Sequence, residues 1–319
     1  MTPKFPSFSL IVPTYNAAPC WPAFYDGIMS QDMPPNQVII LDSSSTDGTS
    51  QLVRDAGFEL ITIRKEDFDH GRTRQAGAQA ASHSDVLLYM TQDAVLAHPE
   101  AFRRLLAAFC DPDLGAACGR QLPRSSARSI EAHARLFNYP PESRIRSLDS
   151  RHRLGFKAIF LSNSFAAYRR SALMSVGGFP EGTLFGEDTL VAARLHDAGW
   201  RTAYVAEAQV CHSHNYTLAE EFRRYFDIGA FHAREQWLID RYGVATGEGR
   251  RFVISEVRFL LRNDWLAIPQ ALARTMAKYV AYQAGKREHR LSAKLKLRLG
   301  LNREFWKRGL ILKHRASNP

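Results

Sequence analysis

The sequence predicts an α/β fold in which a mostly parallel central sheet is flanked by helices and followed by a helical C-terminal region. Over the first two thirds of the chain, short β-rich runs alternate with helix-like segments. Strands and helices that alternate at these distances indicate βαβ units and a mostly parallel sheet. With 319 residues and 45% hydrophobic content, the chain is long enough for one large globular domain, or for a domain with an extension.

Four short apolar runs are expected to form strands of this sheet. They cover residues 9–13, 38–42, 60–63 and 86–90. Helix-like patterns between them cover residues 51–57 and 73–82. Farther along, residues 189–198 carry a helical pattern, and residues 202–206 and 208–214 are expected to be short extended segments.

The character of the sequence changes at about two thirds of its length. We therefore interpret residues 1–216 as an α/β domain and residues 217–319 as a helical C-terminal region. Residues 217–220, Thr-Leu-Ala-Glu, form a capping box that opens a helix. Further helices are expected over residues 252–261 and 268–282.

The end of the chain is strongly basic. The formal net charge is +10, and residues 286–315 carry eleven Lys or Arg against Glu288 and Glu304. Leucines and aromatic residues are interleaved with these cations over residues 291–313. Such a basic amphipathic tail is typical of attachment to an anionic membrane surface. A helix that docks on the protein core, or that serves self-association, would show the same pattern.

Other bulk properties exclude several classes of protein. No N-terminal segment has the basic start and apolar core of a signal peptide, and no apolar run is long enough to span a bilayer. The protein is therefore expected in the cytoplasm. Its four cysteines lack the paired spacing of a zinc site or a thiol-exchange motif, so reduced thiols are expected.

The apolar run at residues 86–95 contains a single carboxylate, Asp93, just after the expected strand. In an open α/β sheet, ligands bind at the carboxyl ends of the strands. Asp93 is therefore expected to face a ligand crevice. An aspartate that merely forms a turn after a strand is the alternative.

Polar groups are also expected at the ends of the first two strands. Pro13, Thr14, Tyr15 and Asn16 offer backbone amides, a hydroxyl and an aromatic face after the first strand. Asp42 ends the second strand, ahead of a Ser/Thr-rich turn that can cap the next helix. Helix capping explains that turn but not Asp42, which precedes it.

A third loop, residues 68–74, places Gly71 and Arg74 beside a second arginine and a histidine, just before a helix. Amides at a helix N-terminus together with guanidinium groups suit a phosphate or diphosphate. A solvated basic turn is the alternative. The chain has neither Gly-x-Gly-x-x-Gly nor Gly-x4-Gly-Lys-Ser/Thr, so dinucleotide and P-loop sites are not predicted.

Two further groups of side chains are candidates for chemistry. Glu187 and Asp188 follow a glycine-rich, aromatic loop and begin a helix, where adjacent acids can also serve only to complement the helix dipole. His212 and His214 are expected on one face of a strand. Their spacing suits a shared metal site, although an isolated pair can also be incidental.

Taken in order, these motifs resemble the family 2 glycosyltransferases of GT-A fold. The resemblance runs from about residue 7 to about residue 216 and rests on five motifs. They are Leu-Ile-Val-Pro-Thr-Tyr-Asn at 10–16, Leu-Asp-Ser-Ser-Ser-Thr-Asp-Gly-Thr at 41–49, Thr-Gln-Asp-Ala at 91–94, Gly-Gly-Phe-Pro at 177–180 and Phe-Gly-Glu-Asp at 185–188. Residues 68–75, together with 91–94, further resemble rhamnosyltransferases that use dTDP-L-rhamnose for cell-surface polysaccharides. Gln75 departs from the asparagine usual there.

The resemblance implies a role for each matched residue. The nucleotide-sugar donor would be bound by Pro13, Thr14, Tyr15, Asn16, Asp42, Gly71, Arg74, Gln92 and Asp93. Asp188 would be the catalytic base, with Glu187 beside it in support. Asp93 would hold a divalent metal, Mg²⁺ or Mn²⁺, with His212 or His214 as a further ligand.

These residue types suit the transfer of a sugar with inversion. A base is needed to deprotonate the acceptor hydroxyl. Positive charge from a divalent ion and from Arg74 would stabilise the departing diphosphate. Thr91 stands where the family has the first acid of its Asp-x-Asp element, so metal is expected to bind when the donor is present.

The acceptor implied by the resemblance is a hydroxyl of a cell-surface polysaccharide or a lipid-linked glycan precursor. A UDP- or GDP-sugar donor is the nearer alternative to dTDP-L-rhamnose. A nucleotidyltransferase would share the nucleotide pocket but release pyrophosphate. A nucleic-acid binder would explain the basic tail but not the acids at the strand ends, so no nucleic-acid partner is expected.

Overall fold

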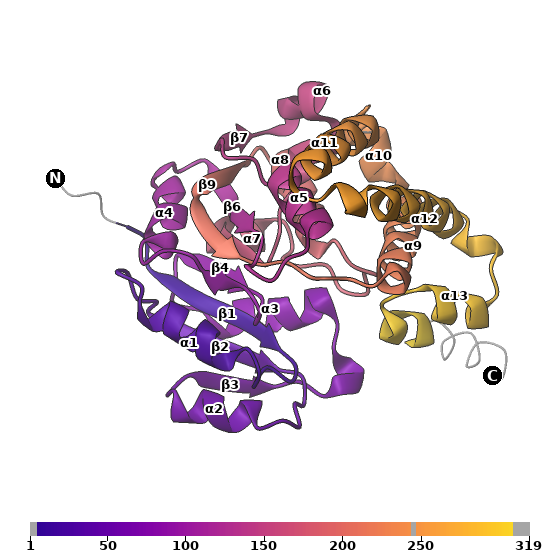
Figure 1. Ribbon diagram of the computed structural model, residues 1–319. Helices are drawn as coiled ribbons and strands as arrows, with labels where there is room; N and C mark the ends of the chain where they lie inside the picture. The colour runs from indigo at the N-terminus through magenta and orange to yellow at the C-terminus, as the bar shows by residue number, and fades with distance from the viewer. Residues whose placement is uncertain (1–4, 244–246, 309–319) are drawn as a thin grey trace, which may run out of the picture.

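The computed structural model describes residues 5–243 and 247–308, and Figure 1 shows a sheet flanked by helices, with a helical region at one side. The strands are β1 (Phe8–Thr14), β2 (Gln37–Asp42), β3 (Glu59–Thr62), β4 (Val86–Met90), β5 (Val95–Leu96), β6 (Leu114–Leu122), β7 (Arg144–Arg146), β8 (Phe165–Arg169) and β9 (Arg201–Cys211). The α-helices of the first part are α1 (Trp21–Met29), α2 (Thr49–Asp55), α3 (His70–Ala80), α4 (Ala101–Leu106), α5 (Ser129–Asn138), α6 (Arg151–Leu154), α7 (Arg170–Ser175) and α8 (Glu187–Asp197). Those of the C-terminal region are α9 (Leu218–Arg234), α10 (Gln236–Tyr242), α11 (Glu248–Asn263), α12 (Ile268–Lys286) and α13 (Ala293–Leu299).

The sheet has nine strands in the order β3-β2-β1-β4-β8-β6-β9-β5, with β7 paired to β9. Strands β3, β2, β1 and β4 are parallel neighbours, and β6 and β9 are parallel to each other. Because β8 is antiparallel to both β4 and β6, these six strands all run in one direction. The expected mostly parallel sheet is therefore confirmed, and the carboxyl ends of its main strands meet at one edge.

Alternating side chains of the central strand β1 feed two cores on the two faces of the sheet. Leu10 and Val12 belong to a cluster that includes Phe102 of α4. Ile11, between them, belongs to a cluster on the other face that includes Val191 of α8. Successive side chains of a strand point to opposite faces, so a strand covered by helices on both sides must be apolar throughout.

Helix α3 begins three residues earlier than the sequence pattern predicts. Asp69 is its N-cap, and one carboxylate oxygen accepts from the backbone N–H of Gly71 at 3.1 Å and of Arg72 at 2.9 Å. A capping side chain satisfies amides that have no partner inside the helix. Gly71 and Arg74 therefore lie within the helix, and not in a loop ahead of it.

The two extended segments expected near residues 202–214 form a single strand, β9, so that expectation is corrected. The register between β6 and β9 shifts from Gly119–Val205 to Arg120–Gln209, which inserts a bulge in β9 without ending it. The strand ends at Cys211. His212 and His214 therefore follow the strand, and do not lie on one of its faces.

The helical region begins at the predicted capping box. Thr217 Oγ1 accepts from the backbone N–H of Glu220 at 3.2 Å, and a carboxylate oxygen of Glu220 accepts from the N–H of Thr217 at 2.8 Å. Helices α9 and α12 then pack closely at two glycines. A Cβ at Gly229 would collide with the carbonyl of Tyr282, and one at Gly285 with that of Phe226 on α9.

The described part of the basic tail docks on α9. The Trp306 side chain is buried, and its indole N–H donates to Asp227 Oδ1 at 2.9 Å. Asp227 Oδ2 accepts from the backbone N–H of Leu301 and of Asn302, at 2.9 and 2.8 Å. The predicted tail continues through residues 309–319, which lie outside the described residues.

Two bulk expectations bear on compartment and attachment. All four cysteines are free thiols. Within residues 5–243 and 247–308, no helix combines the length and apolar character needed to cross a bilayer.

Candidate active site

The ends of β1 and β2 are joined by the carboxylate of Asp42. The Thr14 hydroxyl donates to Asp42 Oδ1 at 3.1 Å. Asp42 Oδ2 accepts from the backbone N–H of Ser45 at 3.0 Å and from the Ser50 hydroxyl at 3.1 Å. Asp42 is only 1% exposed, so its carboxylate connects the two loops from the interior of the protein.

The loop after β1 is also tied to the loop after β4. Tyr15 donates its backbone N–H to Gln92 Oε1 at 2.7 Å, and Gln92 Nε2 donates to the Tyr15 carbonyl at 3.1 Å. The Tyr15 ring is exposed, and its hydroxyl accepts from Lys65 Nζ at 2.6 Å. Pro13 precedes this loop at the end of β1, and Asn16 continues it with a left-handed backbone, φ 49°. The expected nucleotide-binding residues of this edge thus lie together, with an aromatic face open to solvent.

Asp93, His212 and His214 form one cluster, although 119 positions separate the first two in the chain. Asp93 Oδ2 lies 3.3 Å from His212 Nε2 and 3.7 Å from His214 Nε2. One potential ligand atom from each of the three residues lies within 4.8 Å of the others. The short strand β5 brings them together, because Val95 pairs with Cys211 immediately before His212.

The orientation of His212 is fixed by Gln121, which sequence reasoning missed. Gln121 Oε1 lies 2.9 Å from His212 Nδ1 and accepts from Arg135 at 2.6 Å. An oxygen that accepts from Arg135 also accepts from Nδ1–H, so in the neutral imidazole Nε2 carries the lone pair. That lone pair faces the Asp93 carboxylate. Two electron-rich groups in this arrangement suit a cation between them.

Ionisation of Asp93 is favoured by its neighbours. Burial opposes ionisation, but the hydrogen bond that His212 donates from Nε2 when it is protonated, its charge in that form and the charge of His214 hold the pKa of Asp93 well below its usual value. Burial lowers the pKa of His214 to about 4. Arg124 adds positive charge 3.6 Å from Asp93 Oδ2. At neutral pH the cluster therefore offers a carboxylate and a neutral imidazole from His214.

Glu187 and Asp188 occupy the first turn of α8. Asp188 Oδ1 accepts from the backbone N–H of Thr189 at 2.7 Å, and Oδ2 accepts from that of Asn163 at 3.3 Å. The Asn163 side chain donates to Glu187 Oε1 at 2.9 Å and accepts from the hydroxyl of Tyr168 at 2.7 Å. Asn163 thereby orients both acids. No sequence motif distinguishes it.

The side chain of Arg74 reaches Glu187 in the interior. Arg74 Nη1 lies 3.1 Å from Glu187 Oε1, and both side chains are 7% exposed. The same nitrogen donates to the His70 carbonyl at 3.1 Å. Beside this pair, the space that a side chain at Gly71 would need is filled by the carbonyl of Pro180. These contacts join the start of α3 to the loop that leads into α8.

The two acids have opposite pKa shifts. Burial raises the pKa of Glu187, but the charges of Arg74 and His70 and the bond from Asn163 outweigh it, and the net shift is downward. For Asp188, burial and then the charge of Glu187 raise the pKa to about 7. Acids whose environments separate their pKa values are typical of catalytic pairs.

A chain of polar contacts connects the acid pair to the histidine cluster. Gln121 Nε2 donates to the Ser162 hydroxyl at 2.8 Å, while Oε1 of the same side chain faces His212. Ser162 precedes Asn163, whose backbone N–H reaches Asp188. Strand β6 and the loop before β8 thus place the two halves of the candidate site relative to each other.

A hollow of about 520 Å³ lies between the loop that leads to this pair and the helical region. It is lined by Phe68, His70, Leu184, Phe185, Arg224, Asp227, Ile228, Leu301, Asn302, Arg303 and Glu304. Phe185 is two positions before Glu187, and His70 contacts Arg74. Residues adjacent to the acid pair and to its partner Arg74 therefore line the hollow, although the acids themselves do not, and its walls carry aromatic rings and arginines.

The geometry can be compared with known proteins. Residues 9–177 match the family model described as glycosyl transferase family 2. The chain belongs to glycosyl transferase family 2. It is therefore an enzyme, a glycosyltransferase, and the resemblance found from the five motifs is confirmed.

Two curated members of the family match almost the whole chain. An O-antigen chain rhamnosyltransferase, WbaN of Salmonella anatum, is 45% identical over 302 residues, covering 94% of this chain and 96% of WbaN. An O-antigen chain rhamnosyltransferase, RfbN of Salmonella typhimurium, is 44% identical over 299 residues, covering 93% and 95% of the two chains.

Two solved structures share the fold. The mannosyltransferase PcManGT from Pyrobaculum calidifontis, in complex with GDP-Man and Mn²⁺, has a TM-score of 0.56 at 19% identity, covering 99% of this chain and 89% of its own. Residues 1–349 of TarS from S. aureus, in complex with UDP, have a TM-score of 0.51 at 16% identity, covering 89% and 91%. The expected GT-A fold with a helical C-terminal region is confirmed.

The buried Arg74–Glu187 pair gives a stability prediction. The single variant Arg74→Met should lower the free energy of unfolding by about 3–5 kcal/mol, because it leaves the Glu187 carboxylate buried without its cation. The double variant Arg74→Met/Glu187→Met should recover most of this loss, since it removes both charges. Urea unfolding followed by circular dichroism measures both. A double variant no more stable than the single one would contradict the interpretation that the unpaired Glu187 carboxylate causes the loss.

Proposed function

We propose that the protein is an inverting rhamnosyltransferase that moves L-rhamnose from dTDP-L-rhamnose to a hydroxyl of a cell-surface polysaccharide or lipid-linked glycan precursor. The observation that carries the proposal is the 45% identity to an O-antigen chain rhamnosyltransferase over 94% of this chain. The residues at the strand ends, the histidine cluster and the acid pair support it with the chemistry that such a transfer needs. A UDP- or GDP-sugar donor remains the alternative.

The donor nucleotide is proposed to lie at the edge formed by the loops after β1, β2 and β4. Tyr15 offers its exposed ring to the nucleotide, and the loop around it is formed by Pro13, Thr14 and Asn16. The buried carboxylate of Asp42 supports this loop from the interior of the protein. Gln92, bonded to the backbone of Tyr15, fixes the distance between the loop and Asp93.

Gly71 and Arg74 remain proposed neighbours of the donor diphosphate. The Nε of Arg74 is buried without a hydrogen-bond partner among the described residues, although Nη1 is used by Glu187. A buried guanidinium with an unused donor suits an anionic group of a ligand. The carbonyl of Pro180 fills the space where a side chain at Gly71 would lie. Gly71 is therefore proposed to contribute by allowing the loop that contains Pro180 to approach α3 closely.

The histidine cluster is proposed to hold a divalent metal, Mg²⁺ or Mn²⁺. Asp93 supplies a carboxylate, and the Nε2 lone pairs of His212 and His214 supply nitrogen ligands. Nitrogen ligands favour Mn²⁺ over Mg²⁺. When bound, such an ion would neutralise charge on the departing diphosphate. Three protein ligands leave positions for donor phosphate oxygens, consistent with an ion that binds together with the donor.

Asp188 is proposed to be the base. Its carboxylate takes the proton of the acceptor hydroxyl as that oxygen forms a bond to the anomeric carbon of the donor and the bond to the diphosphate oxygen breaks. The hollow lined by Phe185, His70 and Arg224 is proposed to admit the acceptor, because residues adjacent to the acid pair line it. Aromatic faces and guanidinium groups are suited to sugar rings and their hydroxyls.

The enzyme is proposed to work on the cytoplasmic side of the membrane, attached to its anionic surface. Support comes from the lipid-linked acceptor expected for this transfer and from the excess of cations in residues 286–315. The described tail is docked on α9 through Trp306, while Lys294, Arg298 and Arg303 are exposed and available for the proposed attachment by the tail.

The donor can be tested by thermal unfolding with a panel of nucleotide sugars, with and without Mn²⁺. A ligand at about one hundred times its dissociation constant stabilises the folded state by about 2.7 kcal/mol. We expect dTDP-L-rhamnose to raise the melting temperature and UDP- and GDP-sugars to leave it unchanged. A rise in melting temperature produced only by UDP- or GDP-sugars would show that the donor is one of these and not dTDP-L-rhamnose. Release of pyrophosphate in place of dTDP would indicate a nucleotidyltransferase.

The pKa of Asp188 predicts the pH dependence of transfer. A base must be ionised, so kcat/KM should rise with pH and level off above about 7. Glu187→Gln removes a charge that raises the pKa of Asp188, so the rise should move to lower pH. Asp188→Asn should bind donor but lose turnover. Glu181→Gln changes an exposed acid seven positions before Asp188 that pairs with Arg72; it is the control and should leave the profile unchanged. Retained turnover in Asp188→Asn would exclude it as the base.

The metal cluster predicts linked losses of metal and activity. Asp93→Ala should lose most transfer activity, and titration calorimetry with Mn²⁺ and donor should show weakened metal binding, because the carboxylate ligand is removed. The control Asp26→Ala, an exposed acid on α1, should behave as the unmodified enzyme. Full turnover of the unmodified enzyme in excess chelator would rule out the metal role.

A further inference from the structure

Helices α11 and α12, joined by a short 3-10 turn, η5 (Trp265–Ala267), expose an unusual number of large apolar side chains. Six of them are between 53% and 70% exposed. They are Leu261, Trp265, Leu266, Met276, Tyr279 and Val280. Ile254 and Leu272 extend the same region with smaller exposure. We call these eight side chains the α11–α12 face. A large exposed apolar patch on a protein marks an interaction surface.

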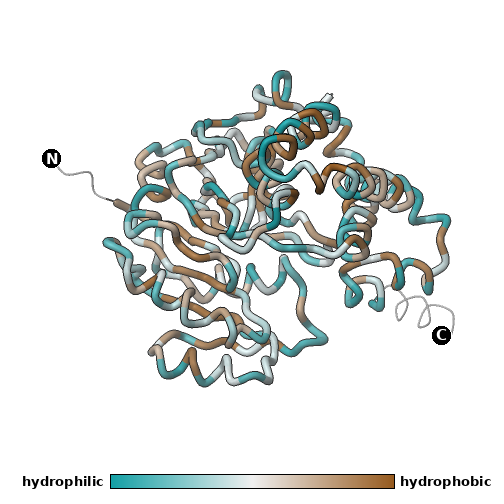
Figure 2. The backbone as a smooth tube through the Cα atoms, in the orientation of Figure 1, coloured by the Kyte–Doolittle hydropathy of each residue, from teal (hydrophilic) through white to brown (hydrophobic). Residues whose placement is uncertain are grey.

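The face follows from the helical spacing of α12. Ala281 and Gly285 are buried against α9, and Ala271 is buried against Ile130 of α5 and Leu260 of α11. Leu272, Met276 and Tyr279, spaced by four and three residues, lie on another side and face solvent. Helix α12 is thus apolar on both sides, and only one of them is covered by the described residues. Figure 2 shows brown segments along α11 and α12.

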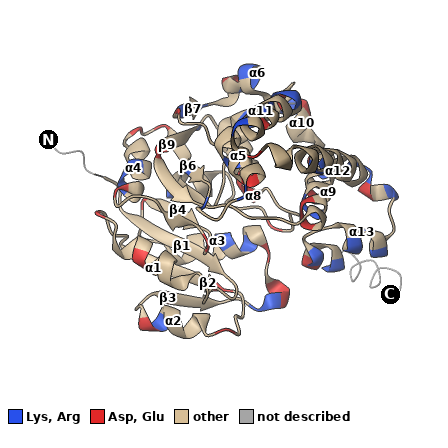
Figure 3. Cartoon of the chain, in the orientation of Figure 1, with Lys and Arg blue, Asp and Glu red and all other residues tan. Residues whose placement is uncertain are grey.

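The charges around the face are mostly positive, although an acid, the half-buried Asp264, lies directly before Trp265. Helix α12 contains no Asp or Glu, and in Figure 3 it is mostly tan, whereas α11 carries blue segments. On α11, Glu256 is buried, and Glu248 is paired with Lys157 and Arg251. Arg258 and Arg262 are exposed and make no ion pair among the described residues. The residues outside that description contain no Asp or Glu.

The apolar and basic parts of this surface are continuous. Arg251, Ile254, Arg258 and Leu261 follow one another by three, four and three residues and so share one side of α11. Ile254 also lines an apolar hollow of about 820 Å³ between α11 and α12, together with Met276 and Tyr279. Arginines therefore border the apolar face along its α11 side.

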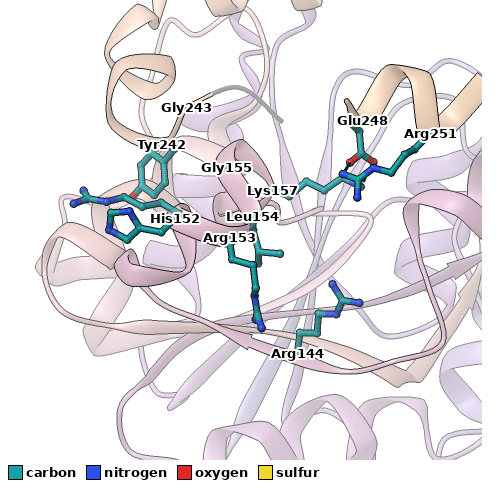
Figure 4. A pocket seen from close by; sticks show the side chains of 11 residues that line it. Arg144, His152, Arg153, Leu154, Gly155, Lys157, Tyr242, Gly243, Glu248 and Arg251 are labelled. Carbon is teal, nitrogen blue, oxygen red and sulfur yellow. Dashed lines mark hydrogen bonds and ion pairs between the residues drawn. The ribbon is translucent and has the colours of Figure 1, made fainter. Parts of the chain in front are cut away.

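A second hollow, of about 850 Å³, continues the basic side beyond Arg251. Figure 4 shows its lining, which includes Arg144, Arg151, Arg153 and Lys157 around the start of α11. Its only acidic lining residue is Glu248, which also lines the apolar hollow. Five cations against one acid create a positive potential that attracts phosphate groups.

We propose that the α11–α12 face is the surface by which the enzyme lies on an anionic lipid bilayer. Trp265 and Leu266 at the turn enter the interface between headgroups and acyl chains, and the arginines of α11 contact lipid phosphates. A tryptophan with leucines, flanked by arginines, is the composition of segments that lie in a membrane interface. The proposal rests on the membrane-surface location included in the proposed function and moves the contact from the tail to this face.

Two other partners for the α11–α12 face, the chain's own tail and a second copy of the protein, fit the observations less well. Most apolar residues of the described tail are engaged, because Trp306 is buried and Leu297, Leu299 and Phe305 pack against the same cluster. Leu295 and Leu301 are each 39% exposed, less than the six most exposed side chains of the α11–α12 face. A second copy related by a two-fold axis would bring the same surface against itself. The exposed arginines of the two copies, which outnumber Asp264, would then come close to one another, whereas an anionic bilayer complements them.

The test is cosedimentation of the full-length enzyme with phosphatidylcholine vesicles, with and without phosphatidylglycerol, at low salt. We expect binding to the anionic vesicles and little to the neutral ones. Trp265→Ser/Leu266→Ser should weaken binding by about tenfold or more, because two large apolar side chains no longer enter the interface. Arg258→Gln/Arg262→Gln should weaken binding to anionic vesicles and reduce its dependence on salt.

Matched controls separate this surface from others and from the enzyme's activity. Met29→Ser removes an equally exposed apolar side chain on α1 and should leave vesicle binding unchanged. Donor-induced thermal stabilisation should persist in every variant, so failure of the bilayer contact is distinguishable from failure of the proposed function. Unchanged binding of Trp265→Ser/Leu266→Ser, with loss of binding on deletion of residues 309–319, would overturn the proposal in favour of the tail. A self-association that these serines abolish, without an effect on vesicle binding, would overturn it in favour of a second copy.

Discussion

The buried ion pair between Arg74 and Glu187 is the contact on which the candidate site depends. Charges are costly to bury unless they are paired, so the pair forces α3 and the first turn of α8 to meet in one orientation. It also keeps Glu187 ionised, and this charge contributes to the raised pKa of Asp188. A structural ion pair and the properties of the proposed base are therefore the same feature of the fold.

The helical region completes the site as well as covering it. Asp227 on α9 holds the start of the tail, and Asn302 in that tail donates to the Leu184 carbonyl at 2.8 Å. Leu184 lies in the loop that leads to the acid pair. A surface of α11 and α12 that lies on a bilayer would fix the orientation of the whole enzyme on the membrane, where a lipid-linked acceptor resides.

Residues at strand ends were the most predictable part of the site. The alternation of apolar runs and turns placed Asp42 and Asp93 at one edge, because parallel strands deliver their carboxyl ends to the same side of a sheet. Helix starts were less predictable: a single aspartate, Asp69, extended α3 back to His70 and drew Arg74 into the interior. Gln121 and Asn163 gave no sequence signal. Their importance arises from what they bond, and those partners lie far away in the chain.

The sequence by itself determined strands β1 to β4 with helices α2, α3 and α8, the candidate acids and histidines, and membership of the family, because these depend on local pattern and on motifs of contiguous residues. Only the tertiary structure decided which of them meet. The pairing of β5 with β9 brings Asp93 to His212, and burial beside Arg74 separates the pKa values of Glu187 and Asp188. It also decided that most described apolar residues of the tail pack inward while several large ones of α11 and α12 face outward, since leucines and arginines at helical spacing predict an amphipathic segment but not which neighbour covers it.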